Sequence, residues 1–449
     1  MHGLGLEEYL ACPGDGRRRP QIPARRLLWG LLIGQVLREC SHHAVEALIR
    51  SRARAALGLR GGFGDDALGY FTERLDPAPA RRALARVLRR AKRNKAFDGA
   101  RWIGLVLDGT GAGRCRESHC ALCHPVRNAE HRVLGHLHHG VAAGVVVPGL
   151  MLPCDGEPYA AGDSEYRAGQ RLLERVVGHL GPRFADYVVA DGEFATAPFL
   201  HTAGDLGLRV VARLKDNLPL LAAATRARFE PQAPDQTWDE AGDRVEVWDA
   251  ADFDPWESLR WPTVRVLRYR QHKPDGQVFE AYWLTDFPVT QVGPRALYRI
   301  AKGRWAIENQ GFNDAKNRYG LEHIPHHHAN SIVIHWLLVF LALTLERLFR
   351  ERHLHRGTHR PRSPIELLRI FRLDLARPAA ADTSCSRPPA PAPGPLRSRP
   401  LTVHPAHACG AAPGAPLSRR GARALSDDGP RWCTPPSPPI TVPRQPKSL

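Results

Sequence analysis

The stretch Trp102–Thr110, with the sequence WIGLVLDGT, is a short apolar run that stops at an aspartate, Asp108. A continuous apolar run of this kind is typical of a strand that is buried on both faces of a sheet. The run Tyr187–Asp191, YVVAD, has the same form and ends at Asp191. The two stretches therefore predict two buried strands, each with an acid at its carboxyl end.

Other predicted elements surround these two runs. Apolar segments indicate strands at 138–147, 149–154 and 208–214, and amphipathic segments indicate helices at 164–180 and 195–207. The predicted order is three strands, a helix, a strand, a helix and a final strand. This order predicts an α/β fold, with a mixed sheet flanked by helices.

Composition divides the chain into five regions. Residues 1–100 have helical patterns, and we expect them to form an N-terminal helical DNA-binding region. Residues 101–216 carry the first part of the α/β core, and residues 291–375 carry its last part with the helix of the third acid. Residues 217–290 contain short strand-like runs and predict a β-rich insertion. Residues 376–449 are rich in Pro and Arg without apolar periodicity, and we predict a disordered tail.

Three acids form the candidate catalytic and metal site: Asp108, Asp191 and Glu308. If the two acid-bearing strands are neighbours, their carboxylates emerge at one edge of the sheet, where a later helix can add Glu308. Three ionised carboxylates cannot lie together without a cation. Mg²⁺ or Mn²⁺ prefers oxygen ligands, and two such ions about 3.5–4 Å apart support phosphodiester chemistry. Taken singly, each acid also fits a turn or a helical ion pair, so the prediction depends on the ordered set.

The sequences around these acids resemble the DDE transposases of bacterial insertion sequences. The matches are LVLDGT around Asp108, VVADGEF around Asp191 and GRWAIENQGFNDAKNRYGLEH around Glu308, and the resemblance covers roughly residues 60–345. It implies a ribonuclease H-like catalytic core with a β-rich insertion between the second and third acids.

The match around the third acid resembles the Tyr/Arg/Glu/Lys signature of this group. Arg304 has the usual spacing to Glu308. Tyr298 lies three residues upstream of the usual tyrosine position, and Lys316 lies one residue beyond the usual lysine position. The resemblance implies that Arg304, Lys316 and Tyr298 contact DNA beside the acids, although Lys316 also fits an ordinary exposed lysine.

The resemblance also implies a reaction and partners. A transposase of this kind binds the terminal inverted repeats of its own element and hydrolyses a phosphodiester at each end with two Mg²⁺ or Mn²⁺ ions. The released 3′-hydroxyl then attacks target DNA in a strand transfer. Two ends must be joined, so we expect a homodimer in a synaptic complex.

The formal net charge of the chain is +17. Such an excess indicates a polyanionic partner, with nucleic acid as the first candidate and an anionic membrane as the second, and a solvated basic surface is the alternative. Residues 76–97, DPAPARRALARVLRRAKRNKAF, predict an amphipathic helix that begins at the capping residue Asp76. Its basic face offers four candidate phosphate contacts, namely Arg86, Arg89, Arg90 and Arg93.

A cysteine cluster follows the first strand. Cys120, Cys123 and His124 form a C-x-x-C-H pattern, and Cys115 lies just upstream. Haem attachment by this pattern requires export, for which we find no signal. Zinc bound by Cys115, Cys120, Cys123 and His124, or by His119 in place of His124, is an alternative. The favoured interpretation is a loop of reduced thiols.

Two other functions remain open beside transposition. One is a ribonuclease H-like nuclease that cuts DNA without strand transfer, and the other is a DNA-binding protein that has lost catalysis. The apolar runs at 27–37 and 332–345 predict buried helices, because the first continues into more helix and the second is short for a bilayer. We therefore expect a cytoplasmic protein without a membrane partner.

Overall fold

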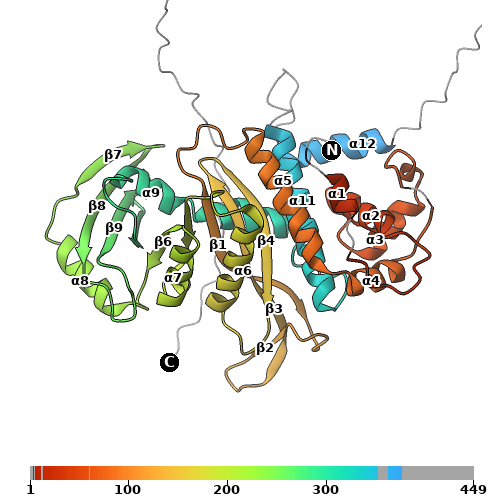
Figure 1. Cartoon of the computed structure of the whole chain (residues 1–449), viewed down its shortest axis with the longest axis horizontal. Helices are drawn as coiled ribbons and strands as arrows, with labels where there is room; N and C mark the ends of the chain where they lie inside the picture. Colours follow the sequence, from red (N-terminus) through yellow and green to blue (C-terminus); the bar gives the residue numbers. More distant parts are fainter. Residues whose placement is uncertain (1–3, 5, 12–13, 60, 352–362, 377–449) are drawn as a thin grey trace, which may run out of the picture. The chain divides into compact units, whose positions relative to one another are not determined.

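A mixed sheet of ten strands forms the centre of the protein (Figure 1). The structure is a computed structural model that describes residues 4, 6–11, 14–59, 61–351 and 363–376. These residues belong to one compact unit, Met1–Asp382. The predicted disordered tail, 376–449, lies outside the described residues except for Ala376.

Six strands form the part of the sheet that carries the two aspartates. Five of them have the order β4–β3–β1–β5–β6. The sixth, β2, lies on the same side of β3 as β4: it pairs with residues 133–138 of β3, and β4 pairs with residues 139–147. Strand β1 is antiparallel to β3 and parallel to β5, which is parallel to β6. The bounds are β1 Gly104–Cys115, β2 Cys123–Arg127, β3 Val133–Val147, β4 Leu150–Tyr159, β5 Tyr187–Ala190 and β6 Arg209–Leu214.

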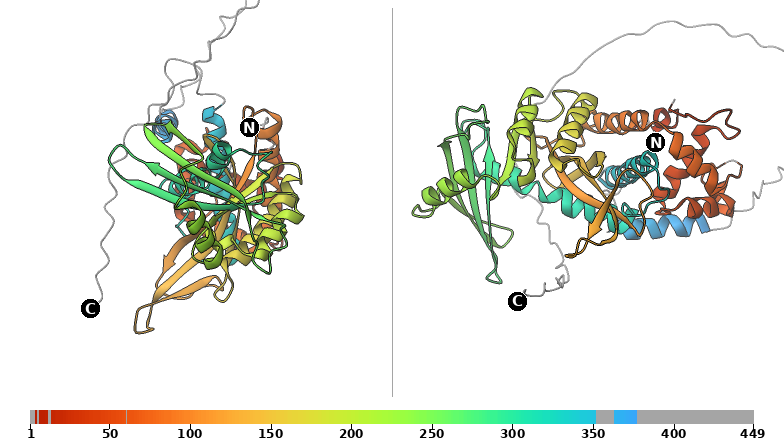
Figure 2. Two further views of the ribbon diagram at one scale, coloured as in Figure 1. Left: turned by 90° about the vertical axis from the view of Figure 1, so that its left-hand side faces the viewer. Right: turned by 90° about the horizontal axis from the view of Figure 1, so that it is seen from below.

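The predicted α/β fold class, a mixed sheet flanked by helices with a ribonuclease H-like core, is confirmed. The sequence did not indicate β2, and it underestimated β1 and β3. Both strands continue beyond their apolar runs. The first part of β3 pairs with β2, and these two strands form a hairpin, the β2–β3 arm, that projects from the sheet in Figure 2.

Two helices follow the strands as predicted. Helix α6 (Glu165–Leu180) packs on β3 and β4, and α7 (Ala197–Asp205) packs on α6 and β6. Helix α11 (Ala329–Phe349) packs on β4 at a place where two glycines are required. A Cβ at Gly140 or Gly156 would lie 2.3 or 3.0 Å from the indole of Trp336.

The N-terminal region is helical in its described part. Helix α5 begins as expected, because the carboxylate of Asp76 accepts a hydrogen bond of 2.9 Å from the backbone N–H of Ala78. Its apolar face is buried against α1, α6, α11 and β4, so the basic face is turned outward. The bounds in this region are α1 Leu6–Leu10, α2 Ala24–Val36, α3 His42–Arg50, η2 Arg52–Arg54, α4 Asp65–Arg74 and α5 Pro77–Arg93.

The β-rich insertion extends the same sheet. Strand β10 pairs antiparallel with β6, and the order continues β10–β9–β8–β7. One helix, α8, precedes these strands. The bounds are α8 Pro219–Phe229, β7 Gln236–Glu240, β8 Asp243–Phe253, β9 Val264–His272 and β10 Val278–Thr285.

The segment that carries the third acid is helical but not one continuous helix. Helix α9 (Pro294–Lys302) ends before Gly303, and the chain then forms a π-helical turn, η4 (Ile307–Phe312), that leads into α10 (Asn313–Tyr319). A Cβ at Gly311 would lie 2.3 Å from the methyl carbon of Met151. A larger residue inside this turn would therefore displace the Met151 side chain of β4.

Two helices complete the described chain, α11 and α12 (Pro364–Ala376). Among the described residues, α11 alone is long and apolar enough to cross a membrane. Within its most apolar window, 83% of the residues are buried inside the protein. Packing in the core therefore accounts for its apolar sequence.

Candidate active site

The first two acids lie at equivalent positions on adjacent strands. Leu107 of β1 pairs with Ala190 of the parallel strand β5. The next residue on each strand is an acid, Asp108 or Asp191, so both emerge at the same edge of the sheet. Neighbouring strands lie about 4.8 Å apart. The spatial relationship that the sequence predicted for these two acids is thus present.

The third acid joins them through an arginine. The guanidinium of Arg304 donates a hydrogen bond of 2.9 Å to Asp108 and another of 2.8 Å to Glu308. The side chain of Arg304 is only 5% exposed, whereas that of Glu308 is 42% exposed. Arg304 therefore fixes Glu308, which extends toward solvent, beside the buried Asp108. A π-helical turn at this point agrees with the frequent occurrence of such turns at functional sites.

The two aspartates have opposite electrostatic environments. Burial raises the pKa of Asp108 to about 7. The charge of Arg304 lowers this pKa, and the carboxylates of Glu308, Asp191 and Glu165 raise it further. Burial also acts to raise the pKa of Asp191, but the hydrogen bond and charge of Lys215 outweigh it and hold this pKa below its usual value. One aspartate is thus readily protonated when no cation is bound, and the other is kept ionised.

Sequence reasoning missed two residues of this site, Glu165 and Lys215. Glu165 begins α6, and its carboxyl group lies so close to β1 that a Cβ at Gly109 would be 2.3 Å from it. Lys215 follows β6 and forms an ion pair with Asp191. No local pattern marks either residue, since Glu165 reads as an acid in the first turn of a helix and Lys215 as part of a polar loop.

The donor set fits a divalent cation. Asp108, Asp191 and Glu308 bring carboxylate oxygens together, and one oxygen of Asp191 (Oδ1) is buried without a hydrogen-bond partner within the described chain. A buried carboxylate oxygen without a partner is costly, and a hard cation with oxygen ligands removes that cost. The pKa of Asp108 is raised chiefly by burial and further by the neighbouring acids, and a bound cation would favour its ionised form.

Two residues of the predicted DNA contacts, Arg304 and Tyr298, are buried in this structure, and their role in DNA binding stays a prediction. Arg304 is buried between two carboxylates and is not exposed to a DNA backbone. Tyr298 is 3% exposed, and its ring packs against those of Trp238 and Tyr269 at centroid distances of 5.3 and 5.1 Å. Tyr298 belongs to the buried side of α9, together with Leu297, Ile300 and Ala301.

Lys316 is partly exposed and forms an ion pair of 3.0 Å with Glu322. The basic residues of α5 lie along an open hollow of about 810 Å³, which Arg183 and the loop before β5 also line. The four arginines predicted there, Arg86, Arg89, Arg90 and Arg93, all belong to its wall. Their role in DNA binding stays a prediction.

The cysteine cluster is assembled, but with a different histidine. Cys115, Cys120 and Cys123 lie together, while His124 hydrogen-bonds the carbonyl oxygen of Tyr159 at 2.7 Å. His124, a ligand in the zinc alternative, therefore has a partner outside the cysteine cluster. The ring of His119, the other candidate, lies tilted against that of His327 at a centroid distance of 4.6 Å.

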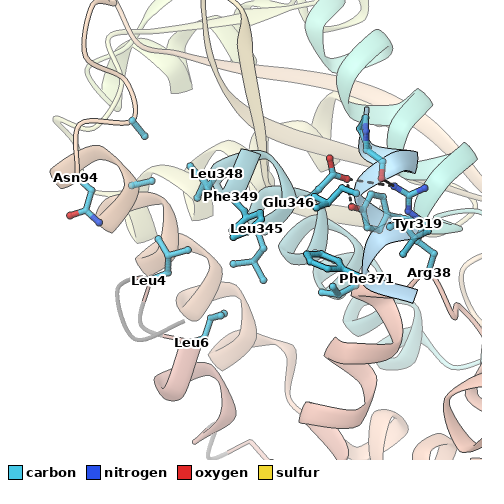
Figure 3. Close-up of a pocket in the computed structure, with 17 residues that line it drawn as sticks. Leu4, Leu6, Arg38, Asn94, Tyr319, Leu345, Glu346, Leu348, Phe349 and Phe371 are labelled. Atoms are coloured by element: carbon cyan, nitrogen blue, oxygen red, sulfur yellow. Dashed lines mark hydrogen bonds and ion pairs between the residues drawn. The ribbon is translucent and has the colours of Figure 1, made fainter. Parts of the chain in front are cut away.

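The protein also has an apolar cavity of about 600 Å³ between α1, α11 and α12 (Figure 3). Apolar side chains, most of them leucine, alanine and phenylalanine, form most of its wall, and Arg38, Tyr319 and Glu346 form a polar corner. None of the three acids lines this cavity. Its chemistry does not match a phosphodiester substrate.

Comparison with known proteins assigns the family. A model of the transposase DDE domain family matches residues 103–345, more than half of the chain. The chain therefore belongs to this family, and the resemblance seen in the sequence is confirmed. No curated protein matches the chain.

Two solved structures show limited similarity. A piggyBac transposase synaptic complex with hairpin DNA is 11% identical, with a TM-score of 0.42, and the match covers 83% of this chain and 76% of that chain. The NurA nuclease from Sulfolobus solfataricus is 9% identical, with a TM-score of 0.23, over 56% of this chain and 82% of that chain.

Proposed function

We propose that the protein is an active transposase that cleaves DNA at the ends of its own element and joins them to target DNA. The observation that carries this proposal is the convergence of Asp108, Asp191 and Glu308 at one edge of the sheet, in a chain of the DDE family. Water attacks the scissile phosphorus, and the bond from phosphorus to the 3′ oxygen breaks. The freed 3′-hydroxyl then attacks a phosphodiester of target DNA.

The chain's own residues have distinct tasks in this proposal. Asp108, Asp191 and Glu308 hold two Mg²⁺ or Mn²⁺ ions. Such ions polarise the phosphodiester and make the attacking oxygen a stronger nucleophile. Arg304 keeps Asp108 and Glu308 at a fixed separation, and it acts as a positioning residue.

The basic hollow beside α5 is the proposed binding surface for the DNA backbone. Arg86, Arg89 and Arg93 project from successive turns of α5 on its exposed side. Each contact between an arginine and a phosphate releases counterions. The logarithm of the binding constant should therefore fall linearly with the logarithm of the salt concentration. Replacing Arg89 and Arg93 by Glu should reduce affinity and lower the salt slope by about 0.9 for each lost phosphate contact. Arg226→Glu, an exposed arginine on α8, is the charge-matched control.

The central test uses the full chain with duplex DNA that carries the sequences flanking its gene. Wild-type protein with Mg²⁺ or Mn²⁺ should cut at the element ends and insert them into a supercoiled plasmid. Asp108→Asn, Asp191→Asn and Glu308→Gln should abolish both steps and keep DNA binding. Glu174→Gln, which changes an exposed acid on α6, is the matched control and should cleave normally.

The alternatives give different outcomes in the same assay. Cleavage without joined products would favour a nuclease that lacks strand transfer. DNA binding without cleavage by wild-type protein would favour a catalytically decayed copy. Terminal inverted repeats and a short target duplication around the gene would support transposition. A homodimer on paired DNA ends and a cytoplasmic location belong to the same proposal.

A further inference from the structure

A compact cluster of metal-binding side chains lies where the β2–β3 arm leaves the sheet, apart from the three acids. It contains Cys115 at the end of β1, Cys120 in the following loop, Cys123 at the start of β2 and His138 in β3. Strand pairing explains how these residues meet, since Cys123 is the register partner of His138, and Cys115 is the partner of His136. A turn in which the N–H of Cys123 donates to the carbonyl of Cys120 brings the two sulfurs of the C-x-x-C pair together.

The ligand atoms of Cys120, Cys123 and His138 all lie within 4.8 Å of one another, close to the spacing of three ligands of a tetrahedral zinc site, and Cys115 lies beside Cys123. The Sγ atoms of Cys120 and Cys123 lie 3.8 Å apart, and those of Cys115 and Cys123 also lie 3.8 Å apart. The Nε2 atom of His138 lies 3.2 Å from the sulfur of Cys120 and 3.5 Å from that of Cys123. Tetrahedral bonds of about 2.3 Å to sulfur and about 2.0–2.1 Å to nitrogen place two sulfurs about 3.8 Å apart and a sulfur and a nitrogen about 3.5 Å apart.

Burial indicates that the cluster is more than a chance grouping of surface thiols. His138 is fully buried and Cys123 is 8% exposed, so the imidazole nitrogen faces two sulfurs inside the protein. Thiols are weak hydrogen-bond partners, whereas a zinc ion would satisfy sulfur and nitrogen at once. Thiolate ligands select zinc over magnesium, which distinguishes this site from the oxygen site of the three acids.

We propose that Cys120, Cys123 and His138 bind one structural zinc ion, with Cys115 as the fourth ligand. The thiols lose their protons to solvent on binding, and no redox step is involved. His138 replaces His124, the histidine of the C-x-x-C-H pattern, because alternation along β2 turns His124 to the face opposite Cys123, whereas His138 is the register partner of Cys123 on β3.

The position of the site suggests what the zinc would hold in place. It joins the arm to the end of β1, the strand that carries Asp108. The segment after α10 also lies here, since the rings of His138 and His327 are 6.3 Å apart, and a Cβ at Gly113 would lie 2.6 Å from Ile324. The zinc would therefore fix the arm relative to both β1 and the segment that follows the third acid.

Metal content of the purified full chain tests this proposal. After expression with added zinc and purification without chelator, elemental analysis should find one zinc per chain. Cys120→Ser, Cys123→Ser and His138→Gln should each reduce the content at least severalfold. His124→Gln and Cys40→Ser are matched controls, since they change a neighbouring histidine and a distant free cysteine, and both should keep one zinc.

A second measurement begins with the wild-type protein, so its main result does not depend on whether a variant folds. Wild-type protein reconstituted with Co²⁺ should show charge-transfer absorption from cobalt–thiolate bonds and the intense visible bands of tetrahedral cobalt. Cys115→Ser should weaken the charge-transfer band without removing it, because two thiolates remain. Wild-type protein with no zinc and no cobalt–thiolate band would overturn the proposal, as would full zinc content in both Cys123→Ser and His138→Gln. Unchanged absorption in Cys115→Ser would overturn the assignment of the fourth ligand.

Discussion

Arg304 lies 2.9 Å from Asp108, although 196 residues separate the two in the sequence. The same guanidinium also holds Glu308 at 2.8 Å, so one buried cation links a strand to the helical segment of the third acid. A planar guanidinium can donate to two carboxylates in fixed directions, which a lysine ammonium cannot reproduce. The relative position of the two acids therefore depends on arginine at this place.

Arg304→Lys should reduce DNA cleavage by about 10²-fold, because small displacements of catalytic groups have effects of this size. The positive charge is retained, so folding and DNA affinity should change little. Arg304→Met should lower the free energy of unfolding by about 3 kcal/mol, because it leaves the largely buried carboxylate of Asp108 unpaired. Single-turnover cleavage, DNA binding and urea denaturation measure these effects separately. Cleavage by Arg304→Lys at the wild-type rate would show that Arg304 does not position the acids.

Gly109→Ala should also impair cleavage, through Glu165. A Cβ at residue 109 would lie 2.3 Å from the Glu165 carboxyl group, so this side chain must move away from the acids. We expect a loss of stability of about 1–3 kcal/mol from the overpacking and a slower cleavage rate. Gly178→Ala is the control, since nothing lies within 4 Å of its Cβ position on the exposed side of α6.

The Gly109→Ala defect could come from displacement of the Glu165 carboxylate or from strain in β1, and Glu165→Gln distinguishes these two causes. It keeps the shape of the side chain and removes its charge. If the Gly109→Ala defect comes from displacing a carboxylate that the site uses, Glu165→Gln should slow cleavage without loss of stability. If Glu165→Gln cleaves normally, the defect of Gly109→Ala arises from strain in β1 alone.

The sequence predicted the acid-bearing part of the fold well because its signals are local. Buried strands that end in Asp108 and Asp191 are continuous apolar runs, and α5 has both a cap and an apolar face. The predicted adjacency of the two strands was correct, because an alternating pattern of strands and helices leaves few arrangements of the sheet.

Other features could not be predicted because they depend on contacts between distant segments. The π-helical turn around Glu308 lies where Gly311 closely approaches Met151 of β4, and no local spacing indicates this contact. His138 was overlooked because the register of β3 against β2, and not its distance from the cysteines in sequence, decides which histidine faces them. Tyr298 and Arg304 were assigned to DNA by resemblance, whereas tertiary packing buries both.

Divalent ions should stabilise the protein through the three acids. An ion that binds only the folded state adds about 2.7 kcal/mol of stability at 100 times its dissociation constant. Added Mg²⁺ or Mn²⁺ should therefore raise the thermal midpoint of wild-type protein in a concentration-dependent way. The shift should disappear in Asp191→Asn and persist in Asp98→Asn, an exposed acid beyond α5. An equal shift in both variants would mean that the ions act elsewhere.

Acid should destabilise the helical region through two buried histidines. Burial lowers the pKa of both His42 and His335 to about 4. His326, His335 and His323 act in the same direction on His42, with Asp65 opposing them. His323 likewise lowers the pKa of His335. The carbonyl oxygen of Gly320 acts in the opposite direction, because it accepts a hydrogen bond of 2.9 Å from Nε2 of His335.

The direction of the pH effect follows from these lowered values. Between about pH 6.5 and pH 4 the unfolded chain binds protons at these positions and the folded chain does not, so stability falls as the pH falls. Each histidine should account for about 3 kcal/mol across this range, since one pH unit corresponds to about 1.4 kcal/mol. Above about pH 6.5 neither residue should affect the pH dependence.

Urea denaturation at a series of pH values measures this effect. His335→Gln keeps a hydrogen-bond donor without a titrating ring, and with His42→Phe it should flatten the slope between pH 4 and 6.5. His43→Gln, at the neighbouring exposed position, is the control and should leave the slope as in wild type. A double variant that loses stability as steeply as wild type over this range would show that other groups drive the acid transition.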